Sequence, residues 1–107
     1  MEINQSLMEK ALHYLGETDE VYAEAKGALE ELEVKRKRYR GRAFTLSEGT
    51  VAERTALAED KQSVIEADFE WIAQVKVFET LKQKRARAIL TIDVWRTLEA
   101  SRRRGNV

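Results

Sequence analysis

The chain of 107 residues contains neither cysteine nor proline, and each absence excludes something. Without cysteine there is no disulfide, no thiol nucleophile, no cysteine-ligated zinc and no iron–sulfur cluster. Without proline, no residue forces a long helix to kink or to stop. His13 is the only histidine, and no ExxH sequence accompanies the many carboxylates, so a di-metal site of the four-helix type is not expected. We expect no metal and no other cofactor.

Long apolar runs and catalytic motifs are also scarce. No stretch approaches the ~18 consecutive apolar residues of a membrane-spanning helix, and the acidic start MEINQSLMEK is unlike a signal peptide. The five glycines are scattered and form no phosphate-binding loop, while Ser47 and Ser63 fit helix caps better than nucleophiles. We therefore expect a cytoplasmic protein that is not an enzyme and does not contact a membrane.

The residues that are present favour long helices. Charged residues make up 36% of the chain and hydrophobic residues 43%, and the hydrophobic positions recur at helical spacing. We expect one all-α domain over residues 1–107, with helices at about 4–15, 18–44, 51–59 and 63–103. Gly16 is expected to end the first helix, and Thr18 to cap the second.

Residues 45–50, TLSEGT, interrupt this pattern most clearly. Thr50 and Glu53 have the spacing of a capping box, and Ser63 with Glu66 repeats it. We favour a short helix that ends near residue 59 and a long helix that begins at residue 63. The spacing by itself also allows one continuous helix from residue 51.

Two of the expected helices carry an apolar seam with alternating spacings of three and four residues, which is typical of coiled coils. The first seam consists of Tyr22, Ala25, Leu29, Leu32, Arg36, Tyr39 and Ala43. The seam of the last helix consists of Val64, Ala67, Trp71, Gln74, Phe78, Leu81, Arg85, Ala88, Ile92, Trp95 and Glu99. The expected fold is an elongated antiparallel helical hairpin with a short N-terminal helix and one long C-terminal helix. Because so thin a structure buries little surface, we expect self-association, with a dimer favoured.

The charges are segregated along the chain although they sum to zero. Residues 33–42 hold six basic side chains against one acidic, and residues 81–107 hold eight against two, whereas the other segments are acidic. Antiparallel folding about residues 45–60 places KRKRYRGR (residues 35–42, the basic stretch) beside the acidic run Glu59–Glu70. Complementary flanks of this kind set the register of helical hairpins.

The basic stretch has a second interpretation, which is a contact with nucleic acid. Arginine and lysine provide most of the non-specific affinity for phosphates, and a tyrosine can stack on an exposed base. The neutral net charge and the lack of a known nucleic-acid-binding motif speak against this interpretation. The sequence favours the hairpin flank and leaves the nucleic-acid contact as the alternative. The residues concerned are Lys35, Arg36, Lys37, Arg38, Tyr39, Arg40 and Arg42.

The distal part of the last helix is the candidate protein-binding surface. In AILTIDVW (residues 88–95) apolar side chains point in nearly every direction, so more than one neighbour has to cover them. A tryptophan on the seam belongs either to the core or to an interface. The C-terminal arginines either form a solvated helix end or hold an acidic partner or nucleic acid. The candidate surface consists of Ile89, Trp95, Leu98, Arg102, Arg103 and Arg104.

Three segments, KRKRYRGRAF, GTVAERTALAE and TIDVWRTLEASRRRGN, resemble small helical proteins of tailed bacteriophages and prophages. The resemblance covers about residues 20–106 and consists of a helix pattern with a VWRT…RR ending, without a catalytic signature. It implies a phage gene of the replication and recombination region, expressed in a bacterial host. The expected function is that of a non-enzymatic interaction module, an accessory or inhibitor of a host or phage DNA-processing protein. Direct nucleic-acid binding through the basic stretch and the C-terminal arginines is the alternative.

Overall fold

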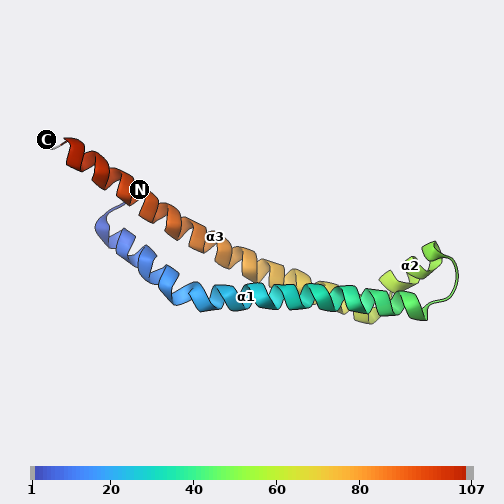
Figure 1. Cartoon of the computed structure of the whole chain (residues 1–107). Helices are drawn as coiled ribbons and strands as arrows, with labels where there is room; N and C mark the ends of the chain where they lie inside the picture. The colour runs from blue at the N-terminus through green and yellow to red at the C-terminus, as the bar shows by residue number, and fades with distance from the viewer. Residues whose placement is uncertain (1, 106–107) are drawn as a thin grey trace. The chain divides into compact units, whose positions relative to one another are not determined.

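The computed structural model describes residues 2–105 and contains three helices in this range (Figure 1). The first, α1, comprises Gln5–Leu46, α2 comprises Val51–Glu59, and α3 comprises Gln62–Gly105. The expected all-α fold is confirmed, as is a short helix at 51–59 that is separate from the long last helix. None of the helices in the described range has an 18-residue window apolar enough to cross a membrane.

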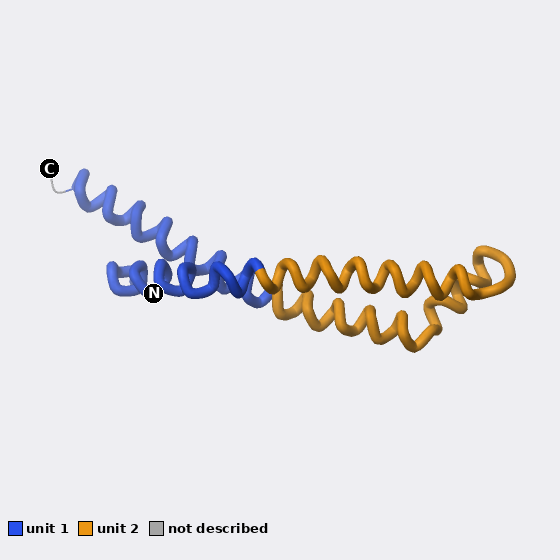
Figure 2. Tube along the Cα trace, turned by 60° about the horizontal axis from the view of Figure 1, so that its bottom comes forward, with its two compact units in different colours: residues 1–23, 79–107 blue, residues 24–78 orange. Residues whose placement is uncertain are grey.

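The chain divides into two compact units, each of which combines a segment of α1 with a segment of α3 (Figure 2). Unit 1 contains residues 1–23 and 79–107, and unit 2 contains residues 24–78, which include α2. The two segments run antiparallel in each unit, as the hairpin interpretation expects. In unit 2 the hydrogen bonds that show this join Gln74 to Ala25, Glu70 to Lys35 and Asp68 to Arg40. In unit 1, Arg85 bonds to Leu15 and Asp19, while Met8 and Ala11 share a core with Ala88 and Ile92.

Both expected seams face inward, so the prediction of the seam residues is confirmed. Every seam position is at least half-buried within its unit. Apart from Phe78, the most buried seam residues are small or aliphatic, which allows the helices to approach closely. The most buried seam residues are Ala25, Ala43, Val64, Ala67, Phe78, Ala88 and Ile92.

One buried cluster of unit 2 takes one residue from each helix. Ala43 of α1, Ala58 of α2 and Val64 of α3 are buried together, with Tyr39 and Phe44 packed against them. Ala58 is the single buried residue of α2. The short helix is therefore attached to the unit by a very small apolar contact.

The expected break after the first helix is wrong, because α1 continues through Gly16. Thr18 does not cap a helix; its hydroxyl donates a hydrogen bond to the carbonyl oxygen of Tyr14, one turn earlier, at 2.7 Å. Met8, Ala11, Leu15 and Thr18 continue the spacing of three and four residues back from Tyr22. Burial of this extended seam against α3 outweighs the cost of about 1 kcal/mol that a glycine carries inside a helix.

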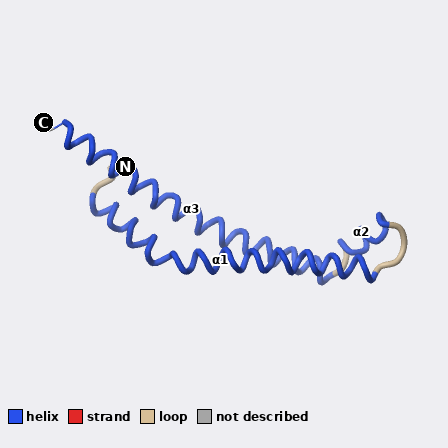
Figure 3. The backbone as a smooth tube through the Cα atoms, in the orientation of Figure 1, coloured by secondary structure: helices blue, strands red, loops and turns tan. Residues whose placement is uncertain are grey.

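Loops separate α2 from α1 and from α3 (Figure 3). Of the two helix caps predicted beside these loops, the cap of α2 is found and the cap of α3 is not. The hydroxyl of Thr50 accepts a hydrogen bond from the backbone N–H of Glu53 at 3.2 Å, so the expected cap of α2 is confirmed. Ser47 bonds to the carbonyl oxygen of Ala43 and so satisfies one of the last carbonyls of α1. Ser63 lies inside the first turn of α3, which begins at Gln62, so its expected role as the cap is wrong.

We predict that Gly16→Ala stabilises the protein by about 0.5–1 kcal/mol in its free energy of unfolding, measured by chemical denaturation. Nothing lies within 4 Å of a Cβ added at Gly16, so alanine gains helix propensity without a clash. Gly49→Ala is the contrasting variant, because Gly49 has φ of 116° and its added Cβ meets the side chain of Glu53. That variant is expected to be destabilised. A destabilised Gly16→Ala protein would mean that the helix ends at this glycine.

Candidate interaction site

The first two residues of the basic stretch bind carboxylates of α3 within unit 2. Lys35 Nζ lies 3.0 Å from Glu70 Oε2, and Arg36 Nε lies 3.1 Å from Asp68 Oδ1. The guanidinium of Arg36 also stacks over the ring of Trp71, 4.2 Å from its centroid, which is a favourable cation–π geometry. These contacts confirm that the basic stretch lies beside the acidic run of α3.

Arg40 connects all three helices. Its Nε donates to Glu59 of α2 at 2.6 Å, and its Nη2 donates to Asp68 of α3 at 2.7 Å. The hydrogen bonds from Arg40 hold the pKa of the Glu59 carboxyl below its usual range. They do the same for the pKa of Asp68, with a further contribution from Arg36. The positive charge of Arg40 is therefore used inside unit 2.

The remainder of the basic stretch is divided between paired and unpaired residues. Lys37 lies 3.4 Å from Glu33 on the preceding turn, and Tyr39 packs against the core of unit 2. Arg38 and Arg42 are exposed and form no ion pair with any described residue. A phosphate backbone would therefore meet two free arginines here, and the other cations would first have to leave their carboxylates.

The residues of the candidate protein-binding surface do not share one face. Trp95 packs against the core of unit 1, whereas Ile89 is 49% exposed and Leu98 is 39% exposed. Ile89 and Leu98 are nine residues apart, which corresponds to about 180° around the helix. Arg102 follows Leu98 by four residues and therefore lies on the same side of α3.

The C-terminal arginines differ in their contacts. Arg102 binds Glu99 at 2.8 Å, one turn earlier on α3. Arg103 and Arg104 are exposed and have no ion pair among the described residues. The last two residues of the expected solvated tail, 106 and 107, lie outside the described residues.

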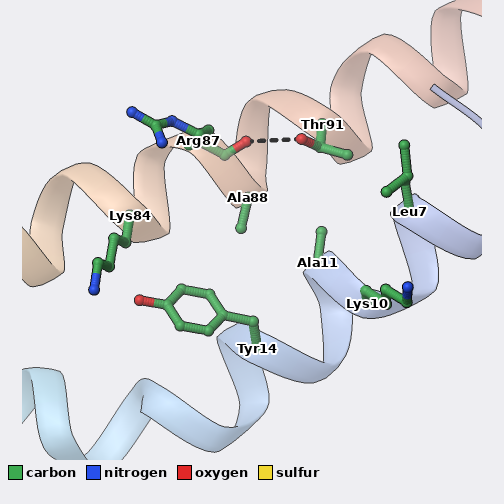
Figure 4. Close-up of a pocket in the computed structure, with 8 residues that line it drawn as sticks. All are labelled: Leu7, Lys10, Ala11, Tyr14, Lys84, Arg87, Ala88 and Thr91. Carbon is green, nitrogen blue, oxygen red and sulfur yellow. Dashed lines mark hydrogen bonds between the residues drawn. The ribbon is translucent and has the colours of Figure 1, made fainter. Parts of the chain in front are cut away.

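A groove of about 320 Å³ runs between α1 and α3 in unit 1 (Figure 4). Its floor is apolar: Ala11 and Ala88 point toward each other across the seam, and the ring of Tyr14 extends from α1 toward α3. We call this surface the basic groove; it is lined by Leu7, Lys10, Ala11, Tyr14, Lys84, Arg87, Ala88 and Thr91.

The rim of the basic groove carries three cations without an ion-pair partner in the described chain. Lys10, Lys84 and Arg87 are exposed, and none of them forms an ion pair with a described residue. No carboxylate lines the groove. Leu98 follows Thr91 by seven residues, so it extends the same side of α3 beyond the groove.

Sequence reasoning missed the basic groove, although a signal for it exists. Leu7 and Tyr14 are seven residues apart, and so are Lys84 and Thr91, which places each pair at one heptad position beside the seam. The expected break at Gly16 separated Leu7 and Tyr14 from the seam of α1. Without that break, the heptads would have placed both on the flank that faces α3.

Arg85 is the other cation that the fold uses internally. Its Nη1 donates to the carbonyl oxygen of Leu15 at 3.0 Å and to the hydroxyl of Thr18 at 2.6 Å, and its Nη2 donates to Asp19 at 2.7 Å. The side chain is only 16% exposed. It therefore belongs to the packing of unit 1 and not to the free positive surface of the groove beside it.

Scans against protein-family models, curated proteins and solved structures find no match to this chain. The resemblance to small bacteriophage proteins stays a prediction. In the part of the chain that the structure describes, no three histidine, aspartate or glutamate side chains are grouped so that they could hold a metal ion.

We predict that acid destabilises the protein partly through Asp68. Its folded-state pKa is depressed, so its stabilising contribution is present above the unfolded-state pKa of about 4 and is lost as the pH falls through the lower folded-state value. The melting temperature should fall between about pH 5 and pH 2, as followed by circular dichroism.

In Asp68→Asn, the melting temperature at neutral pH should be lower and should change less with acid. Asp93→Asn is the matched control, because Asp93 is exposed and forms no ion pair with a described residue. The control should keep the pH dependence of the original protein. An unchanged acid response in Asp68→Asn would contradict the assigned role of its ion pairs.

Proposed function

We propose that the protein is a non-enzymatic interaction module that binds an acidic amphipathic helix of another protein in the basic groove. The observation that carries this proposal is the combination of an apolar floor with a rim of three cations that lack carboxylate partners. In unit 2, by contrast, Lys35 and Arg40 lie beside the seam and are bound to carboxylates. Carboxylates of a partner can pair with the free cations on the rim of the groove in the same way.

The geometry suits a helix better than a small molecule. The groove is bounded by two helices, and a third helix can place apolar side chains at positions i, i+4 and i+7 along it. Contact with Leu7, Ala11 and Tyr14 removes apolar surface from water, at roughly 25 cal/mol per Å². Rim charges contribute mainly to the association rate and to the choice of partner. The floor therefore supplies affinity, and the rim supplies selectivity for an acidic helix.

The chemistry of the lining also supports binding rather than catalysis. The groove presents no carboxylate, imidazole or serine. The hydroxyl of Thr91 donates to the carbonyl oxygen of Arg87 at 3.0 Å within α3, so this group is already engaged. What the groove offers a ligand is apolar contact, positive charge and the hydroxyl of Tyr14.

The resemblance to small phage proteins adds a class of partner to this proposal. We propose that the acidic helix belongs to a host or phage DNA-processing protein, which the module assists or inhibits by occupying one of its surfaces. Leu98 and Arg102 lie on the groove side of α3 and extend the contact beyond the groove. Among the residues of the candidate protein-binding surface, Leu98 and Arg102 support the proposal, whereas Ile89 lies on the opposite side of the helix.

Direct nucleic-acid binding is the second candidate. Exposed arginines without an ion pair among the described residues favour it: Arg38 and Arg42 in the basic stretch, and Arg103 and Arg104 near the end of α3. The ion pairs of Lys35, Arg36 and Arg40 weigh against it, because these cations would lose carboxylates in order to gain phosphates.

We predict that Lys84→Glu/Arg87→Glu weakens the binding of an acidic amphipathic peptide at least about tenfold, because like charges then meet at the rim. The probe is a fluorescein-labelled helical peptide with leucines at i, i+4 and i+7 and glutamates at the other positions, followed by fluorescence anisotropy. Arg38→Glu/Arg42→Glu, with the same change in net charge, is the matched control and should bind like the original protein.

An equal loss in the control would show that the peptide responds to net charge alone, and would overturn the groove as the binding site.

Fluorescence anisotropy also tests the second candidate, nucleic-acid binding, with labelled single- and double-stranded oligonucleotides at low and near-physiological salt. Tight oligonucleotide binding that falls steeply with salt and is lost in Arg38→Glu/Arg42→Glu would establish nucleic-acid binding instead.

A further inference from the structure

The outward side of α3 in unit 2 carries three large apolar residues in one stripe. Phe69 is 67% exposed, Ile72 is 42% exposed, and Ile65 is half-buried. Their spacing of four and three residues places them in one stripe, about 100° around the helix from the seam residue Val64. We call this stripe the Phe69 face; it has the i, i+4, i+7 spacing of a helix that docks into a groove.

The surroundings of the Phe69 face are acidic. Residues 59–70, EDKQSVIEADFE, hold five acidic side chains and one basic; of the acidic ones, Glu59, Asp68 and Glu70 bind cations of α1. Glu66 is exposed and forms no ion pair with a described residue; it accepts only a hydrogen bond from Gln62 at 3.2 Å. Glu70 is bound by Lys35, but its side chain remains 48% exposed. The chain thus contains an acidic amphipathic helix face of the kind that suits the basic groove.

We propose that, in the isolated protein, the Phe69 face of a second copy occupies the basic groove. This inference rests on the proposed function, because it names the segment that fills the same groove when no other partner is present. Phe69 supplies an exposed aromatic anchor for the apolar floor, where Leu7 and Tyr14 provide a matching surface. The carboxylate of Glu66, which forms no ion pair with a described residue of its own chain, meets the unpaired cations of the rim.

The contact joins two different surfaces rather than two copies of one surface. Pairing one Phe69 face with another would place the acidic flanks of both copies side by side, which costs free energy through like-charge repulsion. A contact between unlike surfaces can repeat from copy to copy unless its geometry closes a ring. It also keeps the groove covered, so an acidic helix from another protein has to displace the second copy before it binds.

The test is the state of association over a wide range of protein concentration, measured by sedimentation velocity. Phe69→Ser and Lys84→Glu/Arg87→Glu should each shift half-association to at least about tenfold higher concentration. Val34→Ser is the matched control, because Val34 is 50% exposed on α1 of the same unit and lies outside both surfaces. It should associate like the original protein.

An equimolar mixture of the two impaired variants gives the decisive result. Phe69→Ser keeps the groove, and Lys84→Glu/Arg87→Glu keeps the Phe69 face, so the mixture should associate where each variant alone does not. Recovery in the mixture also shows that both variants are folded. A mixture that stays monomeric overturns the proposed contact.

Two other outcomes separate this inference from the proposed function. If Phe69→Ser associates normally, or if the original protein is monomeric at every concentration, the Phe69 face is not the occupant and the inference is overturned. The groove itself stands in that case as long as the acidic peptide binds and Lys84→Glu/Arg87→Glu prevents this. If the peptide fails to bind as well, both proposals are overturned.

Discussion

The arrangement of unit 2 depends on the guanidinium of Arg40. One side chain of α1 binds Glu59 of α2 and Asp68 of α3, so it fixes both of the other helices at once. The short helix α2 has nine residues and buries only Ala58, which gives it little apolar contact of its own. Without the cation, two carboxylates would face each other, and their repulsion would add to the loss of the hydrogen bonds.

Cations also set the register of the two seams. Arg36 and Arg85 occupy seam positions that are otherwise mostly apolar, and each reaches partners at one place only: Asp68 for Arg36, and Thr18 with Asp19 for Arg85. Alanine-rich seams tolerate sliding, because small side chains fit many neighbours. A slip would leave these partly buried charges without partners, which is costly. The basic stretch is therefore first of all part of the fold.

This internal use of charge makes the unpaired cations informative. In unit 2, Lys35, Arg36 and Arg40 are bound to carboxylates, whereas the cations on the rim of the basic groove in unit 1 form no ion pair with a described residue. The Phe69 face has the complementary composition, because its apolar side chains and the carboxylate of Glu66 are exposed. Both proposals follow from one rule: surfaces that a folded chain leaves charged and apolar together are suited to a partner of complementary chemistry.

The sequence by itself determined the helical fold, both seams, the cap at Thr50 and the pairing of the basic stretch with the acidic run, because these depend on spacing along one helix or on blocks of charge. It did not determine the continuity of α1, since the signals at Gly16 and Thr18 are worth about 1 kcal/mol and burial of the seam outweighs them. Only the tertiary structure decided the basic groove. That surface forms where Ala11 and Ala88 meet across the seam, and it combines flanking residues from helices far apart in the sequence.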